Sequence, residues 1–171
     1  MKMLEYRSFL EYAEQFFHHI RGNHSSSFQC RKGCTGCCEP DLTVLTIEAA
    51  NITEYLMNNP DQIKELQELE EEDPHHGSRC SFLKKDGECG IYPVRPFVCR
   101  SHGAPIAIAR EEYYQIDVCP LNFLNNPIES LGPEDFFLLD QWNEDLLSFH
   151  ESEKRISLRL SSLIRTEIAE D

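Results

Sequence analysis

The sequence predicts a mostly α-helical protein with an irregular, cysteine-rich centre packed between an N-terminal helix and long C-terminal helices. Apolar residues recur at helical spacing near both ends of the chain, which is the pattern of amphipathic helices. Glycine and proline interrupt the middle of the chain repeatedly, as they do in loops and turns. All eight cysteines fall in this middle region, between Cys30 and Cys119.

The length of the chain favours a single domain over residues 1–171, with the cysteine-rich region at 30–119. Globular domains centre on roughly 100–150 residues, and this chain has 171. Its apolar fraction of 40%, with ten Phe, is enough for a helical core, and a charged fraction of 27% argues against disorder. We find no internal repeat and no low-complexity linker that would separate two domains.

The first expected element is an amphipathic helix from Met3 to Ile20. Gly22 and Asn23 follow it as a helix stop. Its apolar residues recur at threes and fours, at Leu4, Phe9, Leu10, Ala13, Phe16, Phe17 and Ile20.

Two further helices are expected before the second half of the cysteine-rich region. One covers residues 46–57, with its first residue as the cap. The next begins at Asn59, with Pro60 at the first helical position and Gln62 as the amide of a capping box. We expect this helix to end early, because its acidic continuation at 65–73 is typical of a solvated helix end or an exposed connection.

The second half of the chain predicts a hairpin followed by helix. Short strands are expected at 105–109 and 113–118, with a turn at 110–112. Pro133 then stands at a natural first helical position, and the segment after it is expected to form one long helix or two, interrupted near Glu153. The apolar positions of this segment are Phe136, Leu139, Trp142, Leu146, Phe149, Ile156, Leu160 and Leu163.

The net charge of −14, from 16 basic and 30 acidic residues, indicates which partners the surface favours. Nucleic acids and anionic membranes bind preferentially to basic surfaces, so neither is an expected partner of this acidic chain. An acidic field concentrates cations, metal ions included. The sequence does not identify a protein partner.

The N-terminal segment predicts a cytoplasmic protein. Glu5, Arg7 and Glu11 interrupt its apolar residues, so it lacks the apolar core of a secretory signal. No run approaches the roughly 18 apolar residues that span a bilayer. Thiols stay reduced in the cytosol, where a defined cysteine pattern indicates metal ligands in preference to disulfides.

The cysteines form a pattern typical of metal ligands. Four of them fall within the nine residues from Cys30 to Cys38, among glycines that free the backbone to turn. A row of inert cysteines on one helix face is the alternative. The preferred ion is zinc, with one or two ions per chain, because four thiolates fill a tetrahedral site. The candidate ligands are Cys30, Cys34, Cys37, Cys38, Cys80, Cys89, Cys99 and Cys119.

The adjacent pair Cys37 and Cys38 is not expected to be two simple ligands of one ion. Neighbouring side chains diverge in extended chain and lie about 100° apart in a helix. Either the two thiols serve different metals, or one bridges two metals, or one lies outside the coordination sphere. If metal is bound in this way, it is expected to stabilise the irregular centre of the fold.

A second block, residues 87–100, reads GECGIYPVRPFVCR. The CxxxCxxCC run followed by this GxCxIYxxRPxxCR block resembles the bacterial YkgJ-like family of zinc- or iron-chelating domains. The resemblance spans Cys30 to Cys119, about half of the chain. It implies a cysteine-cluster fold whose eight cysteines chelate zinc or iron, and it implies no assigned reaction. A flagellin lysine methylase looks like a larger relative of this family, with similar cysteines and an iron–sulfur cluster. An iron–sulfur protein related to such a methylase is therefore the alternative.

Three residues near Cys99 are candidates for supporting roles. Arg95 and Arg100 flank this cysteine and would offset the negative charge of a thiolate site, although they could also be ordinary surface residues. His102 could replace one cysteine in a Cys3His zinc site. Catalytic zinc would need an open position and a base, for which Glu88 and His102 are the only local candidates. Each is a weak candidate, so we assign no catalytic residue.

Two enzyme classes share parts of this pattern and fit the sequence poorly. Cys30-x3-Cys34-x2-Cys37 has the spacing of a radical SAM motif, but here it follows a helix and too few strands come after it. The pair Cys34 and Cys37 has the spacing of a thiol–disulfide oxidoreductase, but no βαβ pattern surrounds it. Storage, sensing or delivery of a metal ion remains a third class.

Overall fold

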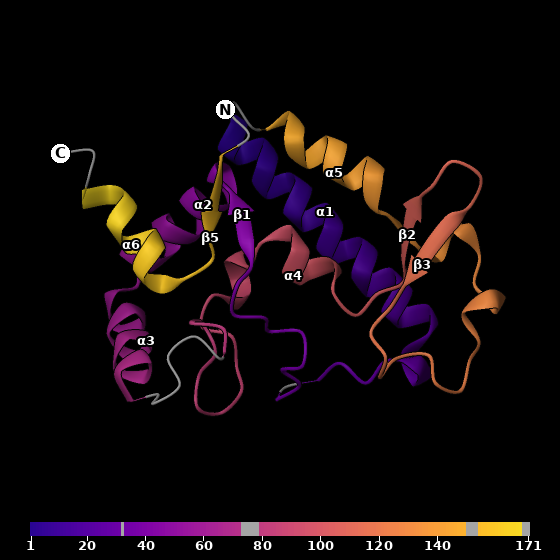
Figure 1. The fold of residues 1–171 in the computed structure, drawn as a ribbon, viewed down its shortest axis with the longest axis horizontal. Coiled ribbons are helices and arrows are strands. Elements are labelled where there is room, and N and C mark those ends of the chain that lie inside the picture. The colour runs from indigo at the N-terminus through magenta and orange to yellow at the C-terminus, as the bar shows by residue number, and fades with distance from the viewer. Residues whose placement is uncertain (32, 73–78, 150–153, 169–171) are drawn as a thin grey trace. The chain divides into compact units, whose positions relative to one another are not determined.

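The computed structural model describes residues 1–31, 33–72, 79–149 and 154–168 (Figure 1). Across these ranges the chain forms six α-helices and five short strands. About half of it is helical, so the prediction of a mostly α-helical fold is confirmed in part. The chain divides into two compact units. Unit 1 comprises Met1–Arg31 and Phe97–Phe149, and unit 2 comprises Lys32–Pro96 and His150–Asp171. Each unit is described by itself.

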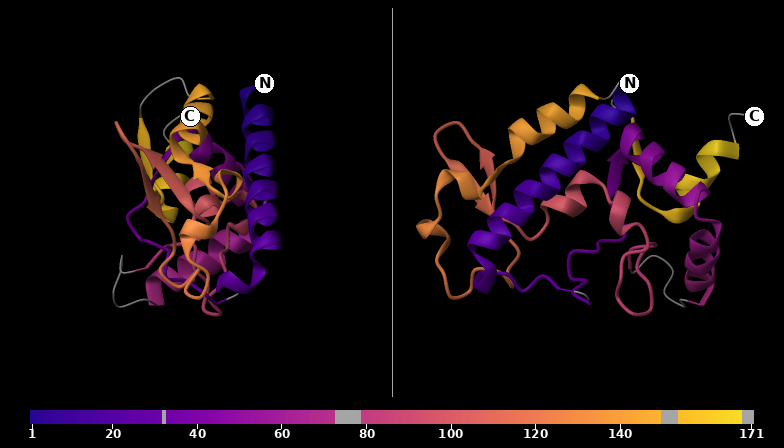
Figure 2. Two further views of the ribbon diagram at one scale, coloured as in Figure 1. Left: turned by 90° about the vertical axis from the view of Figure 1, so that its right-hand side faces the viewer. Right: turned by 180° about the vertical axis from the view of Figure 1, so that it is seen from behind.

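Unit 1 is built around the N-terminal helix α1, which covers Lys2–Asn23 and confirms the prediction. Helices α4 (Phe97–Ser101) and α5 (Leu139–Ser148) belong to the same unit. Figures 1 and 2 show α1 and α5 lying side by side in opposite views. Aromatic rings fill the core, and the Phe9 ring lies 5.3 Å from Phe97 and 5.6 Å from Trp142 between centroids. This arrangement buries the apolar face that the helical spacing predicted.

A small sheet in unit 1 has the strand order β3-β2-β4. Strands β2 (Ile106–Ala109) and β3 (Tyr114–Asp117) pair antiparallel and confirm the predicted hairpin. Strand β4 (Phe137–Leu138) pairs with β2 in parallel, with Phe137 opposite Ile106. Sequence reasoning missed β4, because two residues are too few to show a strand pattern.

Unit 2 contains helices α2 (Thr46–Met57), α3 (Pro60–Glu72) and α6 (Leu160–Ile168), and strands β1 (Thr43–Leu45) and β5 (Arg155–Ser157). The bounds predicted for α2 and the start predicted for α3 at Pro60 are confirmed. The predicted cap of α2 is wrong, because Thr46 is its first helical residue and Leu45 stands at the cap position. The N–H of Leu45 donates to the Glu48 carboxylate at 2.9 Å, which is half of a capping box. Helix α3 continues through the acidic stretch to Glu72, so it does not end early, and residue 73 lies outside the described ranges.

Of the two alternatives expected after Pro133, one long helix or two, the structure shows two helices, α5 and α6. They are shorter than the apolar spacing predicted, because β4 precedes α5 and β5 precedes α6. Strand β5 pairs antiparallel with β1, so that Ile156 lies opposite Val44. This pairing supplies backbone hydrogen bonds from a distant part of the chain, and it overrides the local helical spacing. Glu153, where an interruption was expected, lies outside the described residues.

No helix in the described part of the chain is long and apolar enough to cross a bilayer.

Candidate metal centre

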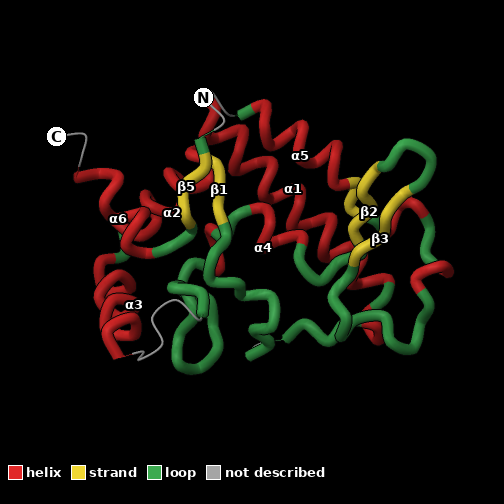
Figure 3. Tube along the Cα trace, in the orientation of Figure 1, coloured by secondary structure: helices red, strands yellow, loops and turns green. Residues whose placement is uncertain are grey.

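The eight candidate cysteines divide between the two units. Unit 1 holds three and unit 2 holds five. None of the eight is in a disulfide; Cys37 is exposed and the others are half-buried. Cys99 lies in α4, whereas the other seven lie in loops and turns, which Figure 3 shows in green. The unit 1 set is Cys30, Cys99 and Cys119, and the unit 2 set is Cys34, Cys37, Cys38, Cys80 and Cys89.

In unit 2, two cysteine-bearing loops approach each other closely. A Cβ atom placed on Gly87 would lie 3.0 Å from the Cα of Gly33, so this approach leaves no room for a side chain. The loop that contains Gly87 is closed at its base, where the N–H of Gly90 donates to the carbonyl of Phe82 at 2.7 Å. An isolated antiparallel bridge also pairs Leu83 with Cys89. The first and second halves of the cysteine motif therefore meet within this unit.

Burial and neighbouring thiols raise the pKa values of three of these cysteines. A hydrogen bond with Cys38, together with burial, raises the pKa of the Cys37 thiol far above its ordinary range. Burial also raises the pKa of Cys80 and of Cys89, and the charge of Cys89 adds to the effect at Cys80. The Arg95 guanidinium opposes the pKa increase at both Cys37 and Cys89. Thiols with such raised pKa values hold their protons until a metal ion replaces them.

The two arginines that flank Cys99 in the sequence have different surroundings. Arg95 acts on cysteines of unit 2, as its effect on their pKa values shows, and its guanidinium lies 4.0 Å from the ring centre of Tyr92. Arg100 is buried in unit 1, where its Nη1 lies 2.5 Å from the carboxylate of Glu14 on α1. The charge of Arg100 is therefore offset by a carboxylate. Arg95 lowers the pKa of Cys37 and of Cys89, Lys84 also lowers that of Cys89, and Arg79 lowers that of Cys80.

In unit 1, a buried asparagine contacts the first cysteine. The Nδ2 of Asn122 lies 3.4 Å from the Sγ of Cys30 and 2.6 Å from the carbonyl oxygen of Gly103. The backbone N–H of Asn122 donates to the carbonyl of Cys119 at 2.9 Å. Asn122 thus connects two cysteine segments with the turn that follows α4. Sequence reasoning missed this residue, and its place three positions after Cys119 is the one hint that the sequence offers.

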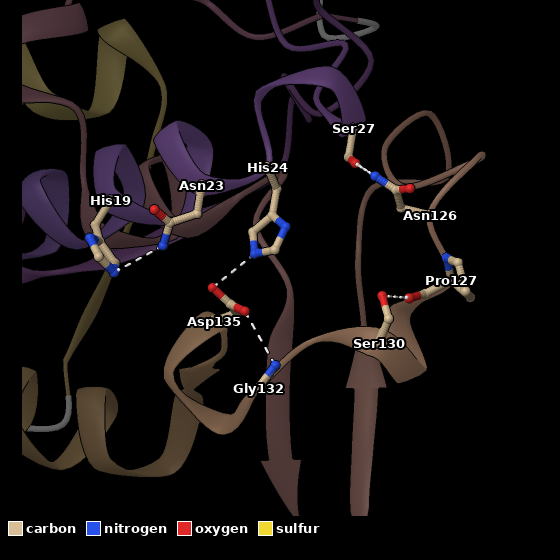
Figure 4. Close-up of polar contacts among 9 residues, drawn as sticks. All are labelled: His19, Asn23, His24, Ser27, Asn126, Pro127, Ser130, Gly132 and Asp135. Carbon is tan, nitrogen blue, oxygen red and sulfur yellow. Dashed lines mark hydrogen bonds and ion pairs between the residues drawn. The ribbon is translucent and has the colours of Figure 1, made fainter.

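The end of α1 is tied to the segment that follows the last cysteine (Figure 4). His24 Nε2 lies 3.0 Å from Asp135 Oδ1, and the Asn126 amide donates to Ser27 Oγ at 2.6 Å. Asp135 also accepts the N–H of Gly132 at 3.2 Å, so its carboxylate is shared between two segments. The His24–Asp135 pair joins the turn before Cys30 to the segment after Cys119, and the exposed side chain of Asn126 adds one hydrogen bond to that turn.

His102 faces its own helical turn. Its Nδ1 lies 3.0 Å from the carbonyl oxygen of Val98, and the side chain is exposed. A ring whose Nδ1–H donates to a carbonyl keeps Nε2 as the nitrogen for a metal. Ligation by His102 stays a prediction.

The donor chemistry of the chain fits a thiolate-bound metal. Eight thiols without disulfides are the soft ligands that zinc and iron take in proteins. Over the described ranges, however, no three His, Cys, Asp or Glu side chains lie close enough together to hold an ion. The donor set still fits a thiolate-bound metal in its chemistry.

Comparison with known proteins identifies one family. The model of the CxxCxxCC family, described as "Putative zinc- or iron-chelating domain", matches residues 29–120, more than half of the 171-residue chain. The chain itself has three residues between its first two cysteines, one more than the family label gives. No curated protein and no solved structure matches the chain.

Proposed function

Because the chain belongs to the CxxCxxCC family, we propose that it is a metal-binding protein that chelates one or two zinc ions through clustered cysteine thiolates. One observation carries this proposal. The family match at 29–120 begins one residue before the first cysteine and ends one residue after the last, so it encloses all eight. A domain whose limits coincide with its cysteines is built around them.

All eight cysteines are the ligands in this proposal, with bridging or supporting positions among them. The approach of Gly33 to Gly87 supports ligation within unit 2, because it brings the Cys34–Cys38 run beside the loop that carries Cys80 and Cys89. A bound ion would be held by these thiolates and would release their protons. The metal would then stabilise the irregular middle of the chain.

An iron–sulfur cluster is the second candidate. The family description names iron as well as zinc, and clusters of this kind are also held by four cysteine thiolates. Either metal needs reduced thiols, so we propose a cytoplasmic location, where the thiols stay reduced. No catalytic residue and no role beyond metal binding is part of the proposal.

The test is elemental analysis of protein purified without oxygen, read with its visible absorption spectrum. We expect about two zinc ions per chain and no colour. Iron with acid-labile sulfide and a brown band would replace zinc with the iron–sulfur alternative. Protein that is folded and holds neither metal after reconstitution would refute both.

The adjacent cysteines provide a matched pair of variants. Cys37→Ser and Cys38→Ser make the same chemical change one residue apart, and only a thiolate in the coordination sphere should lower the metal content when it is lost. We expect the two variants to differ in bound zinc. Equal and complete retention of metal in both variants would exclude this pair as ligands.

A further inference from the structure

Asn122 is a polar side chain with little access to solvent, placed against a candidate ligand. Only 3% of the residue is exposed, and its amide lies beside the sulfur of Cys30. A buried amide is costly unless its hydrogen bonds are made, so the way in which this one makes them is informative.

The contacts of the amide orient it with its donor toward the sulfur. A side-chain amide has two N–H donors and one carbonyl acceptor. The Oδ1 of Asn122 accepts the backbone N–H of Gln29 at 2.8 Å, and Nδ2 donates to the carbonyl of Gly103 at 2.6 Å. The second hydrogen of Nδ2 then faces Cys30 Sγ at 3.4 Å, while Oδ1 is farther from this sulfur, at 3.9 Å. This is the arrangement of an N–H···S hydrogen bond.

The backbone next to Asn122 is held in a strained conformation. Phe123 has a φ of 58°, which L-residues with a large side chain rarely adopt. Packing of its ring against Phe28, at 5.2 Å between centroids, and donation of its N–H to the Ser27 carbonyl at 2.8 Å hold it there. Strain that the surroundings maintain in this way is characteristic of functional sites. Here it fixes the segment that presents Asn122 to the sulfur.

We propose that Asn122 is a positioning residue of the metal centre, whose side-chain N–H orients the Cys30 sulfur and shares the charge of its thiolate. The inference rests on the proposed function, since it concerns a ligand of that centre. Partners that hydrogen-bond to ligands in this way typically change metal affinity by about 10- to 100-fold when they are removed.

A second asparagine in the same loop provides a matched control. Asn126 donates one side-chain hydrogen bond to Ser27 Oγ, in the turn after α1, at 2.6 Å, and its side chain is exposed. Among the described residues it makes no hydrogen bond with a sulfur atom. Asn122→Ala and Asn126→Ala therefore remove the same group from neighbouring positions. Only the first removes a donor to Cys30.

The experiment measures the alkylation rate of each cysteine in the protein as purified, resolved by mass spectrometry, for wild type and both variants. We expect Asn122→Ala to raise the rate at Cys30 by about tenfold, measured relative to the same cysteine in the denatured protein. Asn126→Ala should match wild type at Cys30. An unchanged rate at Cys30, or an equal increase at all eight cysteines, would overturn the proposal.

A spectroscopic measurement separates positioning from a purely structural role. After reconstitution with ¹¹³Cd²⁺ alone, the ¹¹³Cd resonance of the ion bound by Cys30 should shift in Asn122→Ala and stay in place in Asn126→Ala. If Asn122→Ala does not fold, Asn122→Asp takes its place, because it keeps the acceptor for Gln29 and loses both donors. A cadmium spectrum identical to wild type in the folded variant would refute the role.

The metal content of wild-type protein is read separately from these rates. Wild type without metal, together with faster alkylation of Cys30 in Asn122→Ala, would refute the proposed function and leave the contact between Asn122 and Cys30 established. Metal-loaded wild type, together with unchanged alkylation of Cys30 in Asn122→Ala, would support the proposed function and refute the role of Asn122. The two failures are therefore distinguishable.

Discussion

The turn that follows α4 offers a sharp test of the packing around Cys30. Gly103 has a φ of +95°, and a Cβ added to it would lie 2.8 Å from the sulfur of Cys30. An L-residue with such a backbone costs about 1–2 kcal/mol, and overpacking of a filled site costs about 1–3 kcal/mol more. Gly103→Ala should therefore lower the free energy of unfolding by about 2–5 kcal/mol.

Gly22→Ala is the matched control, because the same methyl group should act in the opposite direction there. Gly22 lies in the last turn of α1, and no atom of the described residues lies within 4 Å of the position that its Cβ would take. Alanine in a helix is favoured over glycine by about 0.5–1 kcal/mol, so this variant should be stabilised.

Urea denaturation, monitored by the fluorescence of Trp142, the single tryptophan of the chain, measures both effects. The metal concentration must be the same for all samples, since a bound ion adds to apparent stability. The Gly103→Ala variant should also lose metal more readily, because the methyl group displaces the Cys30 sulfur. A Gly103→Ala protein as stable as wild type, or stabilised like Gly22→Ala, would refute this account of the turn.

Two further predictions concern the core and the thiols. Phe9→Ala should lower the free energy of unfolding by about 3–5 kcal/mol, because Phe9 is buried among aromatic rings. Leu4→Ala, on the exposed side of α1, should change the free energy of unfolding by under about 0.5 kcal/mol. Equal effects of the two variants in urea denaturation would contradict the assigned faces of the helix. The pKa values of Cys37, Cys80 and Cys89 are raised, so protons compete with the metal for these thiols. Zinc affinity should therefore fall as the pH falls, by about tenfold per pH unit for each proton released. Competition with a coloured chelator between about pH 6 and about pH 8 measures this, and a pH-independent affinity would count against thiolate ligands.

The apolar spacing of α1 illustrates how far periodicity reaches. It correctly placed a helix over the first 20 residues, which the structure extends to Asn23. Leu4 was assigned to the apolar face, yet it is 69% exposed, and Tyr6 is fully buried in the same helix. Spacing identifies the helix, but the neighbours that pack against it decide which positions at its ends are covered.

Local chemistry also predicted where α2 and α3 begin and where the β2–β3 hairpin lies, because caps, proline and turn residues act within a few positions of themselves. The same reasoning failed after Pro133. Strand β5 depends on pairing with β1, where Ile156 lies opposite Val44, more than a hundred residues earlier. No short window of sequence contains both partners of such a pairing.

The candidate site also has features that local sequence predicts and features that depend on contacts between distant segments. The eight thiols and the metals that they favour can be read from the order of residues, because ligand type and motif spacing are local properties of the chain. The division of these thiols into three in one unit and five in the other comes from tertiary packing, as does the contact of Asn122 with Cys30 across 92 positions of the chain. Contacts of that kind form when distant segments pack together, and their energy depends on the whole fold.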